Sequence, residues 1–239
     1  MIKIFFAFIF LHPLIGFCQE RQINNHGKLK IGLSFSPNYC FRQLRYTEAN
    51  KWIGNMRNNE IPKRGFTTGA NLQYQINKKI ILETGLLYSD QGEKTKVKDI
   101  VWITPDPAYP IKSNVIYHYQ YIDLPLTIQY RYPGNRINYF FTTGIIMNVF
   151  LVKRTAVTSQ YADGNKNTNA SAKDLGYAKL NLSAKLGFGL NYKISNRLSI
   201  QIEPVFHRSI TSILTDKSTK EYLYHFGICS GVYYNFQSK

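Results

Sequence analysis

The segment from Ala178 to Tyr192 alternates strictly between apolar and polar side chains along its whole length. Successive side chains of a β-strand point to opposite faces, so the segment predicts a strand with one apolar and one polar face. Strands of soluble sheets usually have about five to six residues. A wall with lipid outside and polar groups inside needs longer, two-faced strands. The apolar positions are Ala178, Leu180, Leu182, Ala184, Leu186, Phe188, Leu190 and Tyr192.

The segment from Tyr222 to Phe236, close to the C-terminus, has the same pattern. Two independent segments of this kind favour a transmembrane β-barrel. A soluble sandwich or a lipocalin-like barrel is the alternative, because its strands alternate as well, but such folds seldom carry aromatic outer faces of this length. One face of the segment carries Tyr222, Tyr224, Phe226, Ile228, Ser230, Val232, Tyr234 and Phe236.

A search for alternation along the chain finds eight segments and therefore predicts an all-β, eight-stranded, antiparallel up-and-down transmembrane β-barrel. Short polar turns are expected at residues 77–78, 133–136 and 195–197. The longest connections are 47–64, 96–114 and 154–177. Short turns at one end and long loops at the other are typical of outer-membrane barrels. The expected strands are 29–46, 65–76, 79–95, 115–132, 137–153, 178–192, 198–212 and 222–236.

Residues 1–18 are predicted to be a cleaved signal peptide that precedes a barrel domain of residues 19–239. Lys3 is followed by an apolar run from Ile4 to Phe17, which is shorter than the roughly twenty residues of a transmembrane helix. Small residues precede a cut before Gln19, although lipidation of Cys18 is an alternative. We therefore expect export to the outer membrane of a Gram-negative bacterium.

The formal net charge of +16 is spread along the chain rather than gathered in a nucleic-acid-binding module, so we expect no nucleic-acid partner. The phosphates of outer-membrane lipid and lipopolysaccharide are the better partner for this charge, and a solvated basic surface is the alternative. The basic residues are expected in loops and turns, for example Arg42, Arg45, Lys51, Arg57, Lys63 and Arg64.

An eight-stranded barrel has an interior just wide enough to be filled by side chains. The polar positions predict a structural interior network in which carboxylates pair with bases, because unpaired buried charges cost several kcal/mol. We expect no cofactor, no metal and no catalytic group. Cys40 and Cys229 lie on the first and last strands, so they could form a disulfide across the seam or remain free. The network residues are Glu83, Asp123, Arg131, Lys179, Lys185 and Glu203.

Three functions remain open for such a barrel. Loops on a rigid scaffold often carry function, so Trp52, Trp102 and Tyr109 could bind a protein, a glycan or lipopolysaccharide. A lipid A-modifying enzyme would use His207 with Ser209 and Glu203, but all three are expected to point inward, away from lipid. A small-solute channel would need an open lumen. Binding without catalysis is the preferred hypothesis.

Four motifs carry a family resemblance. They are YIDLPLTIQY at 121–130, LETGLLYSDQG at 82–92, IQIEPVF at 200–206 and the terminal VYYNF at 232–236. They resemble strands of the outer-membrane β-barrel domain family that includes PorT-like proteins. This resemblance implies the eight-stranded fold and a final aromatic strand that the barrel assembly machinery reads. PorT-like members imply a secretion-associated role, although the motifs here are specific for the fold and not for an activity.

Overall fold

Ten β-strands make up the regular structure of the computed structural model, which describes residues 29–47, 58–104, 106–132, 134–173, 176–216 and 218–236. Within these ranges there is no helix long and apolar enough to cross a membrane. The predicted signal peptide and Trp52 lie outside the described residues. The strands are β1 (Leu29–Tyr46), β2 (Glu60–Gln75), β3 (Ile80–Thr95), β4 (Lys98–Asp99), β5 (Lys112–Tyr132), β6 (Ile137–Gln160), β7 (Lys166–Lys173), β8 (Leu180–Lys193), β9 (Leu198–Ser209) and β10 (Thr219–Phe236).

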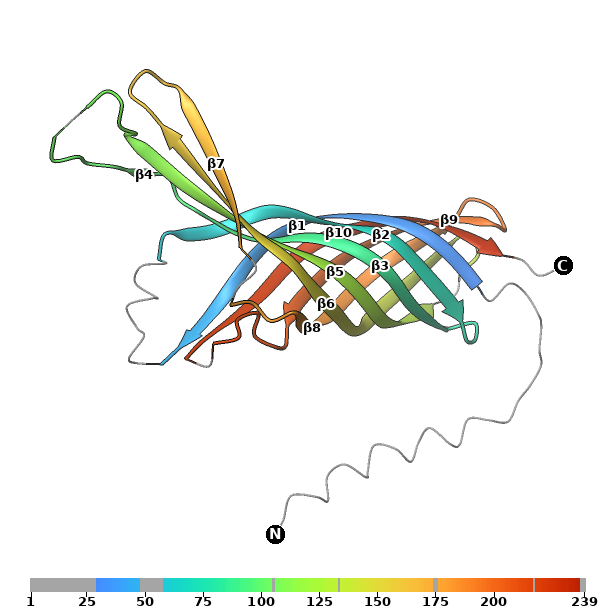
Figure 1. Cartoon of the computed structure of the whole chain (residues 1–239). Helices are drawn as coiled ribbons and strands as arrows, with labels where there is room; N and C mark the ends of the chain where they lie inside the picture. The colour runs from blue at the N-terminus through green and yellow to red at the C-terminus, as the bar shows by residue number, and fades with distance from the viewer. Residues whose placement is uncertain are drawn as a thin grey trace, which may run out of the picture.

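Eight of these strands close into a ring, which confirms the predicted antiparallel barrel (Figure 1). The order around the ring is β1, β2, β3, β5, β6, β8, β9 and β10. The first and last strands close it, from Leu29 opposite Phe236 to Tyr46 opposite Thr219. Closure pairs every strand of the ring on both sides and leaves no open edge in the barrel wall.

The wall of the barrel is apolar outside and polar inside. On β8, Leu186 is 48% exposed and Phe188 is 56% exposed on the outer face, whereas Asn181 and Asn191 are buried in the interior. Soluble proteins seldom expose so continuous an apolar surface. The alternation that predicts two-faced strands is therefore realised with the apolar side chains pointing outward.

Three tight turns lie at the end of the barrel where β1 begins and β10 ends (Figure 1). In the β2–β3 turn, Asn77 Oδ1 accepts the backbone N–H groups of Lys79 and Ile80, both at 2.8 Å. In the β8–β9 turn, Ser195 Oγ accepts the N–H of Leu198 at 3.1 Å. Side-chain acceptors of this kind stabilise short polar turns.

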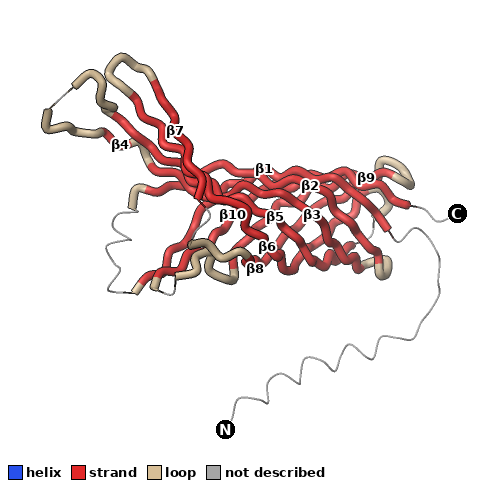
Figure 2. The backbone as a smooth tube through the Cα atoms, in the orientation of Figure 1, coloured by secondary structure: helices blue, strands red, loops and turns tan. Residues whose placement is uncertain are grey.

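A four-stranded sheet, which we call the extension, projects from the other end of the barrel (Figure 2). It consists of β4, the upper part of β5, the upper part of β6, and β7. The prediction of a long loop at 154–177 is wrong, because β6 continues to Gln160 and the chain turns back as β7. A polar strand without the alternation of a lipid-facing strand is hard to recognise from its own residues. The strand β7 forms because it pairs with β6.

Two local features shape the extension. Gly164 has a φ of +86° in the turn between β6 and β7, where residues other than glycine are strained. A bulge lies where Gln120 pairs with Val152 but Tyr121 pairs with Phe150, so that Leu151 is the extra residue. Bulges bend a strand and increase its twist. This one lies where β5 and β6 leave the ring and enter the extension.

Candidate functional site

The middle of the barrel interior contains a buried ion-pair network centred on Lys185. Its Nζ lies 3.1 Å from Glu203 Oε2 and 3.9 Å from Glu83 Oε1. Glu83 Oε2 also accepts hydrogen bonds from Gln73 Nε2 at 2.6 Å and from the Tyr233 hydroxyl at 3.2 Å. These groups belong to β8, β9, β3, β2 and β10, so the network connects strands on several sides of the ring.

The other residues of the predicted interior network lie elsewhere. Asp123 is buried but accepts from the amide of Asn148 at 2.7 Å, and no ion pair of Asp123 with a base is found among the described residues. Arg131 is buried near the short-turn end and donates to Gln129 Oε1 at 2.9 Å. Lys179 is exposed, because it precedes the start of β8 at the outer rim. The inclusion of Lys179 in the interior network is therefore wrong.

A cavity of about 30 Å³ lies beside Lys185 and is lined by side chains from all around the ring. This volume has room for about two water molecules. His207 and His225 face each other across β9 and β10, with ring centroids 4.3 Å apart, and both line the cavity. No group of three or more His, Cys, Asp or Glu in the described ranges could hold a metal ion. The interior is packed rather than hollow.

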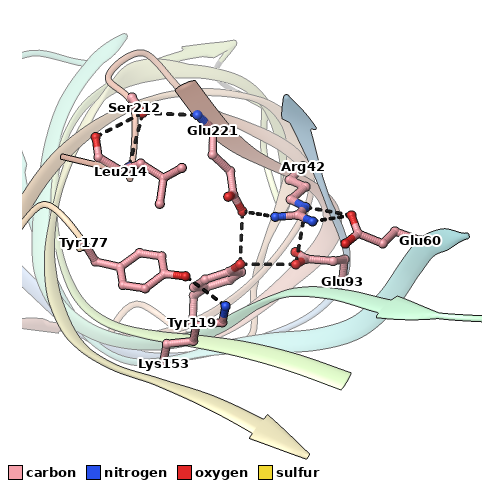
Figure 3. A network of polar contacts seen from close by, with 9 residues as sticks. All are labelled: Arg42, Glu60, Glu93, Tyr119, Lys153, Tyr177, Ser212, Leu214 and Glu221. Carbon is pink, nitrogen blue, oxygen red and sulfur yellow. Dashed lines mark hydrogen bonds and ion pairs between the residues drawn. The ribbon is translucent and has the colours of Figure 1, made fainter. Parts of the chain in front are cut away.

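The outer mouth of the barrel is closed by a second network, centred on Arg42 (Figure 3). The guanidinium contacts three carboxylates: Glu60, Glu93 and Glu221. Its Nη1 donates to Glu221 Oε1 at 2.7 Å, its Nε lies 3.3 Å from Glu93 Oε1, and Nε and Nη2 both donate to Glu60 Oε2. All four side chains are at most 7% exposed. One cation thus joins β1, β2, β3 and β10.

Tyr119 completes this network from β5. Its hydroxyl lies 3.2 Å from Glu93 Oε1 and 3.0 Å from Glu221 Oε1, and one hydroxyl proton serves only one acceptor at a time.

Glu93 lies five residues beyond Tyr88, the last aromatic side chain on the outer face of β3, and so lies beyond the lipid-facing band. Burial raises the pKa of Glu93 to about 8, and the neighbouring Glu221 and Glu60 act in the same direction. A protonated Glu93 relieves the excess of negative charge around Arg42.

Aromatic and aliphatic side chains cover the mouth network. Tyr119, Tyr121, Phe150, Ile213 and Leu223 form a buried cluster. Ile213 comes from the β9–β10 connection, which folds back over the mouth, where Ser212 Oγ accepts the N–H of Glu221 at 3.1 Å (Figure 3). The Nζ of Lys153 donates to the Tyr177 hydroxyl at 2.9 Å. The outer end of the lumen is therefore closed by packed side chains.

The mouth network is not predicted from the sequence, because Arg42, like Lys63, is expected in loops and turns. Both lie in strands and are buried. Strand parity offers a signal, because Arg42 shares its face with the inward-pointing Asn38 and Cys40. The same parity places Glu221 on the face of Leu223 and His225. Extending the alternation beyond the lipid-facing part of each strand would have placed these groups inside.

Cys40 and Cys229 are free thiols, so the seam disulfide is not formed. Cys40 lies opposite His225 in the β1–β10 register, and Cys229 is four residues further along β10. Four residues span about 13 Å along a strand, whereas the α-carbons of a disulfide lie within about 7 Å. The two strands are neighbours as predicted, but their register keeps the thiols apart.

The extension carries an exposed apolar surface, which we call the tip patch. Val101 is 92% exposed and Ile103 is fully exposed. The Trp102 ring contacts the Tyr109 ring in a tilted arrangement with centroids 4.8 Å apart, and its Nε1 donates to the carbonyl of Pro110 at 2.8 Å. These contacts order the segment that presents the exposed side chains. The tip patch comprises Val97, Val101, Trp102, Ile103, Tyr109 and Ile111.

Comparison with known proteins gives one family match and several structural likenesses. A family model described as "Outer membrane protein beta-barrel domain" matches residues 17–215. No curated protein matches the chain. Neisserial surface protein A is 8% identical and aligns over 88% of this chain and 99% of its own length, with a TM-score of 0.49. OprG of Pseudomonas aeruginosa is 11% identical over 90% and 98%, with a TM-score of 0.45. Ail of Yersinia pestis is 12% identical over 86% and 98%, with a TM-score of 0.32.

Proposed function

We propose that this chain, which belongs to the family of outer membrane proteins with a β-barrel domain, is a non-catalytic binding protein of the bacterial outer membrane. In this proposal the barrel is a closed anchor, and the extension presents a binding surface to the cell exterior. The tip patch is the observation that carries the proposal. Exposed apolar side chains at the end of an ordered projection are typical of a surface for a protein partner.

The shape of the extension supports this role. Paired strands carry the tip patch well beyond the barrel rim, where the long loops of outer-membrane barrels face the exterior (Figure 2). Three lysines lie next to residues of the patch in the sequence: Lys96 precedes Val97, Lys98 follows it, and Lys112 follows Ile111. An apolar centre with a charged rim is the usual anatomy of a protein–protein interface. A protein partner therefore fits this surface better than a glycan does.

Site-specific photo-crosslinking in intact cells of the native host tests this role. A photoreactive side chain at Val101 or Ile103 is expected to give one discrete protein adduct. The matched controls are Asn167 and Ala170 on β7, which are exposed on the same extension but lie outside the patch. The absence of any adduct at the patch, or the same adducts at all four positions, would contradict the proposal.

The packed lumen supports a closed anchor rather than a small-solute channel. The interior cavity is small, and the mouth network and its aromatic cover lie across the outer end. We expect no stable conductance when the folded protein is reconstituted in planar bilayers, because no continuous aqueous path is available for ions. Reproducible conductance steps of porin size would overturn this expectation.

A non-catalytic role agrees with the placement of Glu203, His207 and Ser209. All three share the inner face of β9, where His207 and Ser209 are two residues apart, about 6.5 to 7 Å along the strand, and Glu203 and His207 are four residues apart, about 13 Å. The His207 ring contacts the His225 ring in a tilted arrangement, away from lipid. A secretion-associated role, which the resemblance to PorT-like proteins implies, is a narrower form of the proposal. An adduct that contains a component of a secretion apparatus would support it.

A further inference from the structure

An outward-facing groove of about 280 Å³ lies on the opposite side of the wall from the interior networks. It is lined by Arg45, Ala184, Arg208, Ser209, Ile210 and Tyr222, which come from β1, β8, β9, β10 and the residue that follows β9. Ala184 lies between Leu182 and Leu186 on the outer face of β8, and its small side chain leaves the hollow. Neither interior network contributes to this groove.

The strand registers place the groove at the upper edge of the apolar band. Arg208 lies opposite Ala184 on one side and Tyr224 on the other. The next outward row toward the short-turn end lies about 7 Å lower along the strands. That row is entirely apolar or aromatic and consists of Leu186, Phe206, Phe226 and Tyr39. The groove is therefore at the depth where hydrocarbon gives way to lipid headgroups.

Two guanidinium groups are held over this groove. Arg208 Nη2 donates to Gln43 Oε1 at 2.6 Å, and Arg45 Cζ lies 5.5 Å from the centre of the Tyr222 ring. No carboxylate of the described residues forms an ion pair with either arginine. Lys220, opposite Arg45 in the register, adds a third exposed cation. In the described part of the chain, the partners that orient this positive charge, Gln43 and Tyr222, are neutral.

Guanidinium groups bind phosphate through paired N–H donors, which match the geometry of its oxygens. The groove opens on the lipid-facing side, and its lower end continues onto the row with Phe206 and Phe226. An anion that is attached to acyl chains can therefore contact the arginines and the aromatic row together. Free phosphate would contact the arginines alone.

We propose that this groove binds a phosphate group of an outer-leaflet glycolipid, with the acyl chains of the lipid against Phe206 and Phe226. The guanidinium groups of Arg45 and Arg208 hold the phosphate. Tyr222, Ile210 and Ala184 form the apolar floor under the adjoining sugar. The site is separate from the tip patch, so either proposal can fail without the other.

Native mass spectrometry of the mature folded protein in detergent tests the site with lipid A as the probe. We expect phosphorylated lipid A to remain bound to the wild type. The double variant Arg45→Gln/Arg208→Gln is expected to bind at least about ten-fold more weakly, because two charge-assisted contacts are lost. Heat-modifiable migration on gels verifies that both proteins are folded.

The control variant Arg136→Gln/Arg197→Gln removes the same charge from the turns at the other end of the barrel and is expected to bind as the wild type does. Dephosphorylated lipid A is expected to bind weakly, and a large excess of inorganic phosphate is expected not to displace the lipid. Three results would each overturn the proposal: equal weakening by both double variants, displacement by phosphate at the concentration of the lipid, or equal binding of phosphatidylglycerol.

Discussion

Replacing Arg42 by methionine is expected to lower the free energy of unfolding by about 3 to 5 kcal/mol, because the substitution removes the buried cation that contacts Glu60, Glu93 and Glu221. Glu60, Glu93 and Glu221 come from three strands that Arg42 joins. Methionine retains much of the volume of arginine, so the lost charge dominates the effect. Denaturant titration of the refolded protein in detergent micelles measures the change.

The pH dependence of this loss separates a charge effect from a packing effect. Without Arg42 the carboxyl groups around it are protonated more completely at pH 5 than at pH 8, so the loss is expected to be smaller at pH 5. Adding Glu93→Gln and Glu221→Gln to the variant is expected to recover much of the stability. Arg64→Met, at an exposed position of β2, is the matched control and is expected to change the stability by less than about 0.5 kcal/mol. An Arg42→Met deficit of the same size at both pH values would show that Arg42 acts through packing.

Lys185→Met is expected to have an effect of similar size, about 3 to 5 kcal/mol, at the middle of the barrel. The substitution removes the cation that contacts Glu203 and Glu83. Glu83 keeps its hydrogen bonds from Gln73 and Tyr233, so we expect Glu203 to account for most of the loss. The same denaturant titration provides the measurement.

Two further variants test the interpretation. Lys185→Met combined with Glu203→Gln is expected to recover most of the stability, because no unpaired charge remains on Glu203. Lys193→Met is the matched control and is expected to be nearly neutral, because Lys193 lies at the exposed end of the same strand, where its Nζ donates to the carbonyl of Asn135. If Lys185→Met is as stable as the wild type, the interior ion pairs contribute little to folding.

The barrel wall carries charged side chains on both of its faces, in the two interior networks and in the outer groove. Inward-pointing charges close the lumen and connect the strands, whereas the outward-pointing Arg45 and Arg208 face the headgroup region. The parity of β1 separates Arg42 from Arg45, which are three residues apart and lie on opposite faces. The high net positive charge therefore serves more than one purpose in this protein.

Several features of the fold follow from the sequence alone because they depend on neighbours within a strand. The alternation at 178–192 and 222–236 predicts β8 and β10, with the apolar face outward. The Asn77 and Ser195 turns are predicted for the same reason, since a polar side chain there bonds the adjacent backbone. An even number of ring strands then places the start of β1 and the end of β10 at the same end of the barrel, with the short turns.

The contacts between strands are decided by the tertiary structure. Arg42 meets Glu60, Glu93 and Glu221 only because four strands share one register at the mouth, and Cys40 misses Cys229 by four residues for the same reason. The strand β7 depends on its pairing with β6, since its own residues have little preference for extended structure. The alternation of side chains along a strand is a local property of the chain. The register between neighbouring strands arises from the closure of the whole ring. The sequence by itself therefore determined which face each residue of the lipid-facing strands occupies, and the closed barrel decided which residues meet there.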